Sequence, residues 1–225
     1  MIAFQLSAWA ESILIYKMTN NIRKSILLFG GTFDPIHNGH LVVAQYVAKH
    51  LGIDKVYIIP AAISPHKLDK KITSGQHRYE MAKLATRGMD LFEVSDCELH
   101  RPGASYTFDT IYHFEKKYPQ AKLHWLIGAD CLEHLHNWYR VDKLVTHCTI
   151  VTASRPGFRF AVNKYLHDVL DDEKIEEIRS HIIATPLLDI SSTAIRECIS
   201  ANKDCSGMTP AVILEYIGQH NLYRN

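Results

Sequence analysis

Hydrophobic and polar positions follow two alternating periods along most of the chain. Short apolar runs predict buried strands at 26–29, 55–60, 91–97, 123–127, 149–152 and 182–184. Between them apolar residues recur at helical spacing, for example at Leu41, Ala44, Val47, Ala48 and Leu51. Strands that alternate with helices are typical of a parallel sheet covered on both faces. The pattern therefore predicts an α/β fold: a Rossmann-like, doubly wound parallel sheet with a C-terminal helical segment.

Several helix boundaries follow from local signals. Thr73-Ser74-Gly75-Gln76 has the form of a capping box and predicts a helix start. A helix is expected from Tyr106-Thr107 to about Tyr118, and residues 160–180 are helical in pattern. Further helices are expected after residue 190 and around residues 212–217.

The length of 225 residues predicts one domain with a well-buried core. We place this domain at residues 23–225 and expect residues 1–22 to form an extension outside the fold. The first 17 residues are apolar, but they lack a basic start and a convincing cleavage site, and Glu11 interrupts them. They are also too short to span a bilayer, so we expect no membrane association.

Charge and cysteine content exclude several classes of protein. The 25 Lys and Arg residues nearly balance the 24 Asp and Glu residues, so no basic surface for nucleic acid is indicated. The five cysteines are odd in number and show no C-x-x-C pair. This favours reduced thiols in a cytoplasmic protein over a disulfide framework or a zinc site.

The stretch from Ile26 to His40, ILLFGGTFDPIHNGH, carries the clearest chemical signal. An apolar strand is followed by two glycines and then by the start of a helix, where His37 and His40 lie three residues apart. Free N–H groups and the dipole at a helix N-terminus attract phosphate, and the imidazoles add donors. The stretch therefore predicts a cradle for a triphosphate.

A second stretch, Ile190 to Arg196 (ISSTAIR), repeats this chemistry near the end of the chain. Hydroxyl groups at a helix start bind anions, and a guanidinium one turn further can fork onto phosphate oxygens. Taken alone, it also reads as an ordinary helix cap followed by a surface arginine.

Together these motifs resemble a known family. The pattern G-G-T-F-D-P-x-H-x-G-H resembles the first signature of the nucleotidylyltransferase superfamily, and I-S-S-T-x-I-R resembles its last. One branch, the bacterial-type nicotinate mononucleotide adenylyltransferases, is resembled further by P-H-K at 65–67, R-x-G-x-S-Y-T at 101–107, G-A-D at 128–130, W-Y at 138–139 and R-P-G at 155–157. The resemblance runs from about Ser25 to the C-terminus.

The resemblance implies that the chain transfers the adenylyl group of ATP to nicotinate mononucleotide. His37, His40 and Arg196 would be catalytic. The implied ATP site comprises Gly30, Gly31, Thr32, Phe33, His37, Gly39, His40, Ile190, Ser191, Ser192, Thr193 and Arg196.

The resemblance also implies a site for the mononucleotide. Trp138 would stack on the pyridine ring, and the backbone N–H groups of Thr107 and Tyr139 would bind its carboxylate. The remaining implied contacts are Asp130 to the ribose, His66 and Lys67 to the phosphate, and Gly128 and Arg155 in the same site. From the residues alone, core aromatics are the favoured interpretation of the Trp138-Tyr139 pair, while Asp130 could be a helix cap and 66–67 an exposed loop.

The implied reaction needs little from the protein beyond positioning. The attacking phosphate has its second pKa at about 6, so it is largely dianionic at neutral pH and needs no general base. Mg²⁺ would arrive bound to ATP, and we expect no metal ligands from the protein.

Three other functions stay open at this stage. Pantetheine-phosphate adenylyltransferases share both signatures but usually have Thr where this chain has His37, and they are shorter. Cytidylyltransferases share the H-x-G-H motif, but their C-terminal signature differs from the ISSTAIR stretch of this chain. A non-catalytic nucleotide-binding module on the same fold is a third alternative. The sequence leaves the oligomeric state open, a homo-oligomer included.

Overall fold

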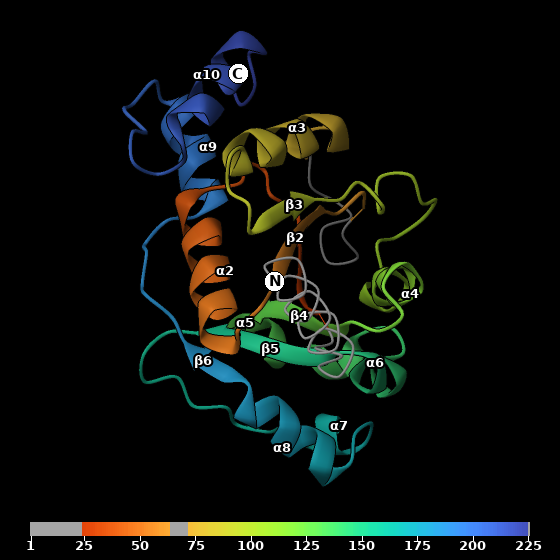
Figure 1. Ribbon diagram of the computed structural model, residues 1–225. Helices are drawn as coiled ribbons and strands as arrows, with labels where there is room; N and C mark the ends of the chain where they lie inside the picture. Colours follow the sequence, from red (N-terminus) through yellow and green to blue (C-terminus); the bar gives the residue numbers. More distant parts are fainter. Residues whose placement is uncertain (1–23, 64–71, 225) are drawn as a thin grey trace, which may run out of the picture.

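A computed structural model describes residues 24–63 and 72–224 of the chain. Its centre is a six-stranded parallel sheet in the order β3-β2-β1-β4-β5-β6 (Figure 1). The strands are β1 Ser25–Gly31, β2 Lys55–Pro60, β3 Phe92–Val94, β4 Lys122–Gly128, β5 Thr149–Ser154 and β6 Ile182–Ala184. The strand order reverses direction between β1 and β4, as in a doubly wound sheet, so the predicted fold class is confirmed.

Helices cover both faces of this sheet. They are α2 Asn38–Leu51, α3 Gly75–Thr86, α4 Thr107–Lys117, α5 Ala129–Leu132, α6 Val141–His147, α7 Lys164–His167, α8 Asp172–Ser180, α9 Ser192–Ser200 and α10 Ala211–Gln219, with a 3₁₀ turn at Leu135–Asn137. The apolar side chains of α2, α3, α9 and α10 join one core cluster, and those of α4, α6, α7 and α8 join the other.

Alternation along each strand divides the core between the two clusters. Leu27 of β1 and Leu126 of β4 face the α2 side, whereas Ile26 and Leu28 face the α4 side. Because both faces are covered, most positions of a central strand are occupied by apolar residues. This is why the strands read as continuous apolar runs in the sequence.

The strand register brings the ends of β1 and β4 to one edge of the sheet. Leu28 of β1 pairs with Tyr57 of β2 on one side and with Trp125 of β4 on the other. The loops that follow β1 and β4 therefore leave the sheet next to each other. In a doubly wound sheet this crevice at the strand-order reversal is where ligands bind.

The helix start predicted at residues 73–76 is confirmed, because α3 begins at Gly75 and the Ser74 hydroxyl caps it by accepting the His77 N–H at 3.4 Å. One predicted boundary is wrong by a few residues. The strand predicted at 91–97 ends at Val94, since the Ser95 hydroxyl accepts the Cys97 N–H and turns the chain away from the sheet. A local side-chain acceptor thus overrides the apolar pattern at this point.

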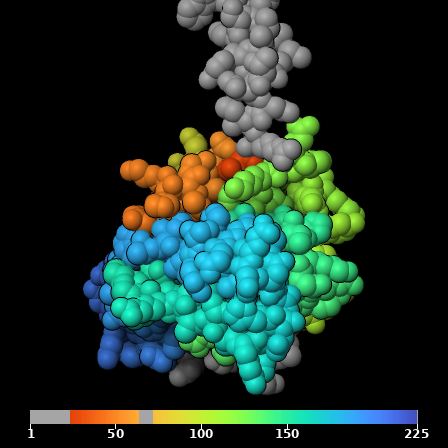
Figure 2. All heavy atoms as spheres, turned by 90° about the horizontal axis from the view of Figure 1, so that it is seen from below, coloured from red at the N-terminus to blue at the C-terminus, as the bar shows by residue number. Residues whose placement is uncertain are grey.

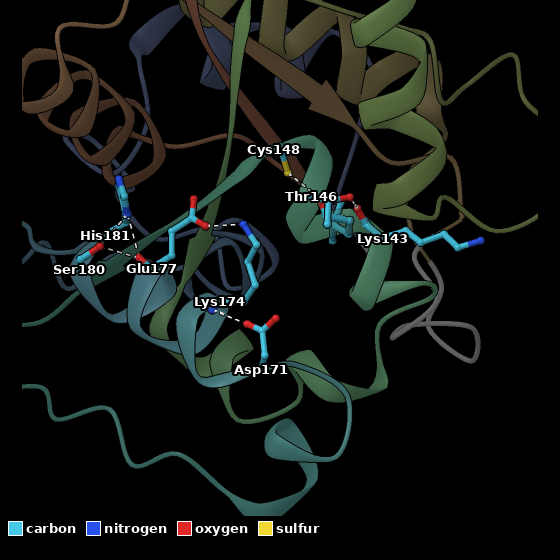
Figure 3. A network of polar contacts seen from close by, with 9 residues as sticks. Lys143, Thr146, Cys148, Asp171, Lys174, Glu177, Ser180 and His181 are labelled. Atoms are coloured by element: carbon cyan, nitrogen blue, oxygen red, sulfur yellow. Dashed lines mark hydrogen bonds and ion pairs between the residues drawn. The ribbon is translucent and has the colours of Figure 1, made fainter.

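The helix predicted at 160–180 is also wrong, because it is divided into α7 and α8. Asn163 caps α7 through a 3.0 Å bond from the Leu166 N–H. Asp171 caps α8 by accepting the Lys174 N–H at 2.8 Å, as Figure 3 shows. Each short polar side chain satisfies a free N–H group and so begins a new helix.

The residues between β5 and β6, which include α7 and α8, form a continuous part of the face shown in Figure 2. Among the described residues, no helix is both long enough and apolar enough to cross a membrane.

Candidate active site

Two cavities open at the edge of the sheet where β1 and β4 end. The first has a volume of about 460 Å³ and the second about 820 Å³. Five residues line both cavities: Phe29, Leu126, Ile127, Gly128 and Asp130. The cavities are therefore neighbours across a shared wall at the strand-order reversal.

The glycine turn after β1 lies against the first cavity. A Cβ atom at Gly30 would lie 2.4 Å from the ring of Trp125, so this position requires glycine. Gly31, Thr32 and Trp125 line the first cavity beside Gly30. Phe33, which has a left-handed φ of 49°, packs edge-on against His40 with 5.0 Å between the ring centroids.

The two signature histidines form a reciprocal cap on α2. The His40 backbone N–H donates to His37 Nδ1 at 3.3 Å, and the His37 backbone N–H donates to His40 Nδ1 at 3.2 Å. The two rings stack with their centroids 3.6 Å apart. Gly39 lies below them, where a Cβ would come within 3.0 Å of His37 Nδ1.

This cap determines which ring nitrogens can donate to a ligand. Each Nδ1 accepts a backbone N–H and carries no proton, so a ring N–H must be at Nε2. Burial lowers the pKa of His37 to about 4, so this imidazole is neutral at pH 7. His37 and His40 both line the second cavity. Both can therefore offer an Nε2–H donor to an anion while their Nδ1 atoms hold the helix.

The ISSTAIR stretch packs onto the same turn. Ser191 caps α9 by accepting the Ala194 N–H at 3.1 Å, and Ser192 Oγ donates to the Pro35 carbonyl at 2.9 Å. Arg196 Nη1 donates to the Asp34 carbonyl at 2.8 Å, while Nη2 donates to Thr193 Oγ1 at 3.2 Å. Ile190 lines the second cavity. The ordinary cap is thus present, but the arginine is anchored to the signature turn and is not a loose surface residue.

The first cavity is lined by the aromatic pair that the sequence assigns to the mononucleotide, Trp138 and Tyr139. Thr107, Trp138 and Tyr139 line it together with Gly128 and Asp130. Thr107 is the first residue of α4, so its N–H belongs to the helix start. Tyr139 is 41% exposed, which differs from a core position.

The loop before Thr107 is tied to the end of β2. The Ser105 N–H donates to the Ile63 carbonyl at 2.9 Å, and Ser105 Oγ accepts the Ala62 N–H at 3.0 Å. Arg101 Nη2 donates to the Tyr106 carbonyl at 3.3 Å. These bonds hold the start of α4 at the cavity.

The structure separates some residues that the sequence assigns to one site. Gly30, Gly31 and Thr32, expected at ATP, line the first cavity beside the residues expected at the pyridine. Arg155, expected at the mononucleotide, lines the second cavity with the histidines. The predictions for His66 and Lys67 fall outside the described residues.

One buried cation was missed by the sequence analysis. Arg78 of α3 is 1% exposed and donates to the carbonyls of Thr32, Ala61 and Thr73, each within 2.8 Å. It thereby ties the glycine turn to the loop after β2. The signal was available, because this arginine occupies a position of the apolar stripe that Met81 and Ala85 continue.

A buried acid was missed as well. Glu98 is 3% exposed, lines the first cavity and accepts the Thr110 hydroxyl at 2.6 Å. Burial raises the pKa of its carboxyl group. Nothing in its sequence context distinguishes it from a surface glutamate.

The charged and polar donors of the second cavity suit an anion. The imidazole Nε2–H groups of His37 and His40 and the guanidinium of Arg155, which all line this cavity, can donate hydrogen bonds to phosphate oxygens. Within residues 24–63 and 72–224, no three His, Cys, Asp or Glu side chains cluster in a way that could hold a metal ion.

Comparison with known proteins agrees with this geometry. Residues 28–198 match the family described as cytidylyltransferase-like. A Clostridium tetani protein named "probable nicotinate-nucleotide adenylyltransferase" is 39% identical over 201 residues, which are 89% of this chain and all of that protein. A Neisseria meningitidis protein of the same name is 40% identical over 201 residues, 89% of this chain and 98% of its own.

A solved structure supports the fold. Plasmodium falciparum nicotinic acid mononucleotide adenylyltransferase complexed with NaAD superposes with a TM-score of 0.71 at 21% identity, covering 89% of this chain and 98% of that one. This structure shows the fold alone, whereas the two relatives at 39% and 40% identity show the family. The chain therefore belongs to the nicotinate-nucleotide adenylyltransferase family, within the cytidylyltransferase-like proteins.

Proposed function

We propose that this protein transfers the adenylyl group of ATP to nicotinate mononucleotide, giving nicotinate adenine dinucleotide and pyrophosphate in NAD biosynthesis. The names of its relatives support this activity. The observation that carries the proposal is the pair of cavities with a shared wall at Gly128 and Asp130. Two substrates, one in each cavity, would meet at that wall with their phosphates adjacent.

The second cavity is the proposed ATP site. His37 and His40 would donate from Nε2 to the phosphates at the start of α2, where the helix dipole also favours negative charge. Arg196 would add a charged donor, since a guanidinium has five N–H groups and two of its nitrogens are already anchored on the protein. Neutralising charge on the leaving pyrophosphate is the main catalytic contribution of such groups.

The first cavity is the proposed mononucleotide site. Trp138 would stack on the pyridine ring, and the N–H groups of Thr107 and Tyr139 would bind the carboxylate of that ring. Asp130, in the shared wall, would accept hydrogen bonds from the ribose. His66 and Lys67 are proposed to bind the mononucleotide phosphate, and Arg155 to act from the second cavity.

The reaction is a displacement at the α-phosphorus of ATP. An oxygen of the mononucleotide phosphate forms a bond to this phosphorus, and the bond to the oxygen that bridges to the β-phosphorus breaks. Pyrophosphate leaves with that electron pair. The nucleophile is already ionised, so no protein base has to remove a proton. Mg²⁺ is proposed to enter as part of the ATP substrate, because it prefers phosphate and water oxygens.

Pyrophosphate release with different acceptors tests this proposal. With ATP as the other substrate, kcat/KM for nicotinate mononucleotide should be at least tenfold higher than kcat/KM for its amide, nicotinamide mononucleotide. A carboxamide would leave one of the two N–H donors unpaired, which costs about 1–3 kcal/mol. Activity with phosphopantetheine, or with CTP and not ATP, would instead place the chain in another branch. No release with any acceptor would favour a nucleotide-binding module.

Two variants separate the proposed contacts. Thr107→Ala retains the backbone N–H and should change kcat/KM little. Trp138→Ala removes the stacking surface and should lower kcat/KM for acid and amide alike. Selectivity that survives Trp138→Ala but disappears in Thr107→Ala would contradict the assignment of the main-chain groups.

A further inference from the structure

Asp34, in the turn between β1 and α2, connects four separate parts of the chain. Its side chain is almost fully buried, with 5% of the residue exposed. Oδ1 accepts the Tyr223 hydroxyl at 2.6 Å, and Oδ2 accepts the Thr73 N–H at 3.3 Å. Its backbone carbonyl accepts Arg196 Nη1 at 2.8 Å. One residue thus joins the signature turn, the start of α3, the guanidinium of α9 and the C-terminal turn.

Tyr223 reaches this turn from 189 positions away in the sequence. It follows α10 in a turn that the Leu222 N–H closes onto the Ile217 carbonyl at 3.0 Å. Its φ of 61° is left-handed, an uncommon conformation for a tyrosine. Burial and the nearby Asp34 carboxylate raise the pKa of Tyr223, so its hydroxyl stays protonated and donates at neutral pH.

We infer that Tyr223 is a positioning residue for adenylyl transfer: it holds Asp34, and through the Asp34 carbonyl it aims the guanidinium of Arg196 at the ATP phosphates. The inference rests on the proposed function. Without the hydroxyl, a buried carboxylate oxygen loses its donor and the turn can shift. Displacements of about 1 Å in such a group can cost on the order of 10²-fold in rate.

Tyr223→Phe removes only the hydroxyl, and Tyr216→Phe is the matched control. Tyr216 lies on α10, but its hydroxyl bonds to Nδ1 of His77 on α3 at 2.9 Å and not to Asp34. We expect Tyr223→Phe to lower kcat about tenfold or more, or to raise KM for ATP similarly. KM for nicotinate mononucleotide should stay within twofold. Tyr216→Phe should match the wild type in all three constants.

A double-variant cycle distinguishes positioning from general stability. In an Arg196→Ala background, Tyr223→Phe should cost less than a further twofold, because the group it aims is gone. An equal tenfold loss in that background would overturn the inference, as would wild-type constants in Tyr223→Phe itself.

ATP binding, measured by calorimetry, keeps the inference separate from the proposed function. If the wild-type chain releases no pyrophosphate, the proposed function fails and the ATP dissociation constant alone decides on Tyr223. The inference then requires at least threefold weaker binding in Tyr223→Phe than in Tyr216→Phe. Equal dissociation constants in the two variants would reject it.

Discussion

His37 performs two tasks with two ring nitrogens, and substitution can separate them. Nδ1 caps α2, while Nε2 is available to the second cavity. His37→Asn keeps a side-chain acceptor at the cap and removes the Nε2 donor, whereas His37→Ala removes both. Asparagine ranks among the best capping residues, and replacing such a cap by alanine costs about 1 kcal/mol.

The expected magnitudes differ between the two properties. Both variants lose the same ring packing, so the difference in their melting temperatures isolates the cap. About 1 kcal/mol corresponds to about 2–4 °C in a chain of this size, and Asn should melt higher than Ala by that amount. Losing a donor to the transition-state phosphates should lower kcat by about 10²–10³ in both variants alike.

Calorimetric melting and pyrophosphate release measure the two effects on the same samples. Equal melting temperatures for His37→Asn and His37→Ala would reject the capping role. A folded Asn variant that retains wild-type kcat would reject the role of Nε2 as a phosphate donor.

Three further predictions concern stability. Burial lowers the pKa of both His37 and His124 to about 4, so the unfolded chain takes up protons first, near pH 6.5. The contribution of these two histidines to the free energy of unfolding is therefore fully present above this pH and should fall by about 2 kcal/mol per histidine at pH 5. Urea unfolding measures this change, and an unfolding midpoint that does not depend on pH would contradict it. Arg78→Met leaves three carbonyls without a donor and should lower the free energy of unfolding by about 3 kcal/mol or more, while the surface control Arg87→Met should not. A chain that begins at Met18 should keep the full-length melting temperature and kcat, and a clear loss of either would reject residues 23–225 as a sufficient domain.

Sequence patterns were sufficient wherever the determining interactions are local. The apolar runs predicted strands that are buried on both faces of the sheet, and the helical spacing of apolar residues from Leu41 to Leu51 predicted α2. The strand, the glycine turn and the helix start behind the proposed phosphate site were equally predictable, because they are consecutive in the chain. The reciprocal cap of His37 and His40 is local too, but it went unseen because histidine is not the usual residue of a capping box.

Only the tertiary structure decided which distant residues complete the site. Trp125 behind Gly30, Arg78 beneath the turn and Tyr223 on Asp34 belong to segments far apart in sequence. Their roles depend on the order of the strands and on where α3 and the C-terminal turn pack. Hydrophobic periodicity reports that a residue is buried, but it carries no information on the partner that burial provides. The division into two cavities arises in the same way, since it exists only where β1 and β4 end side by side.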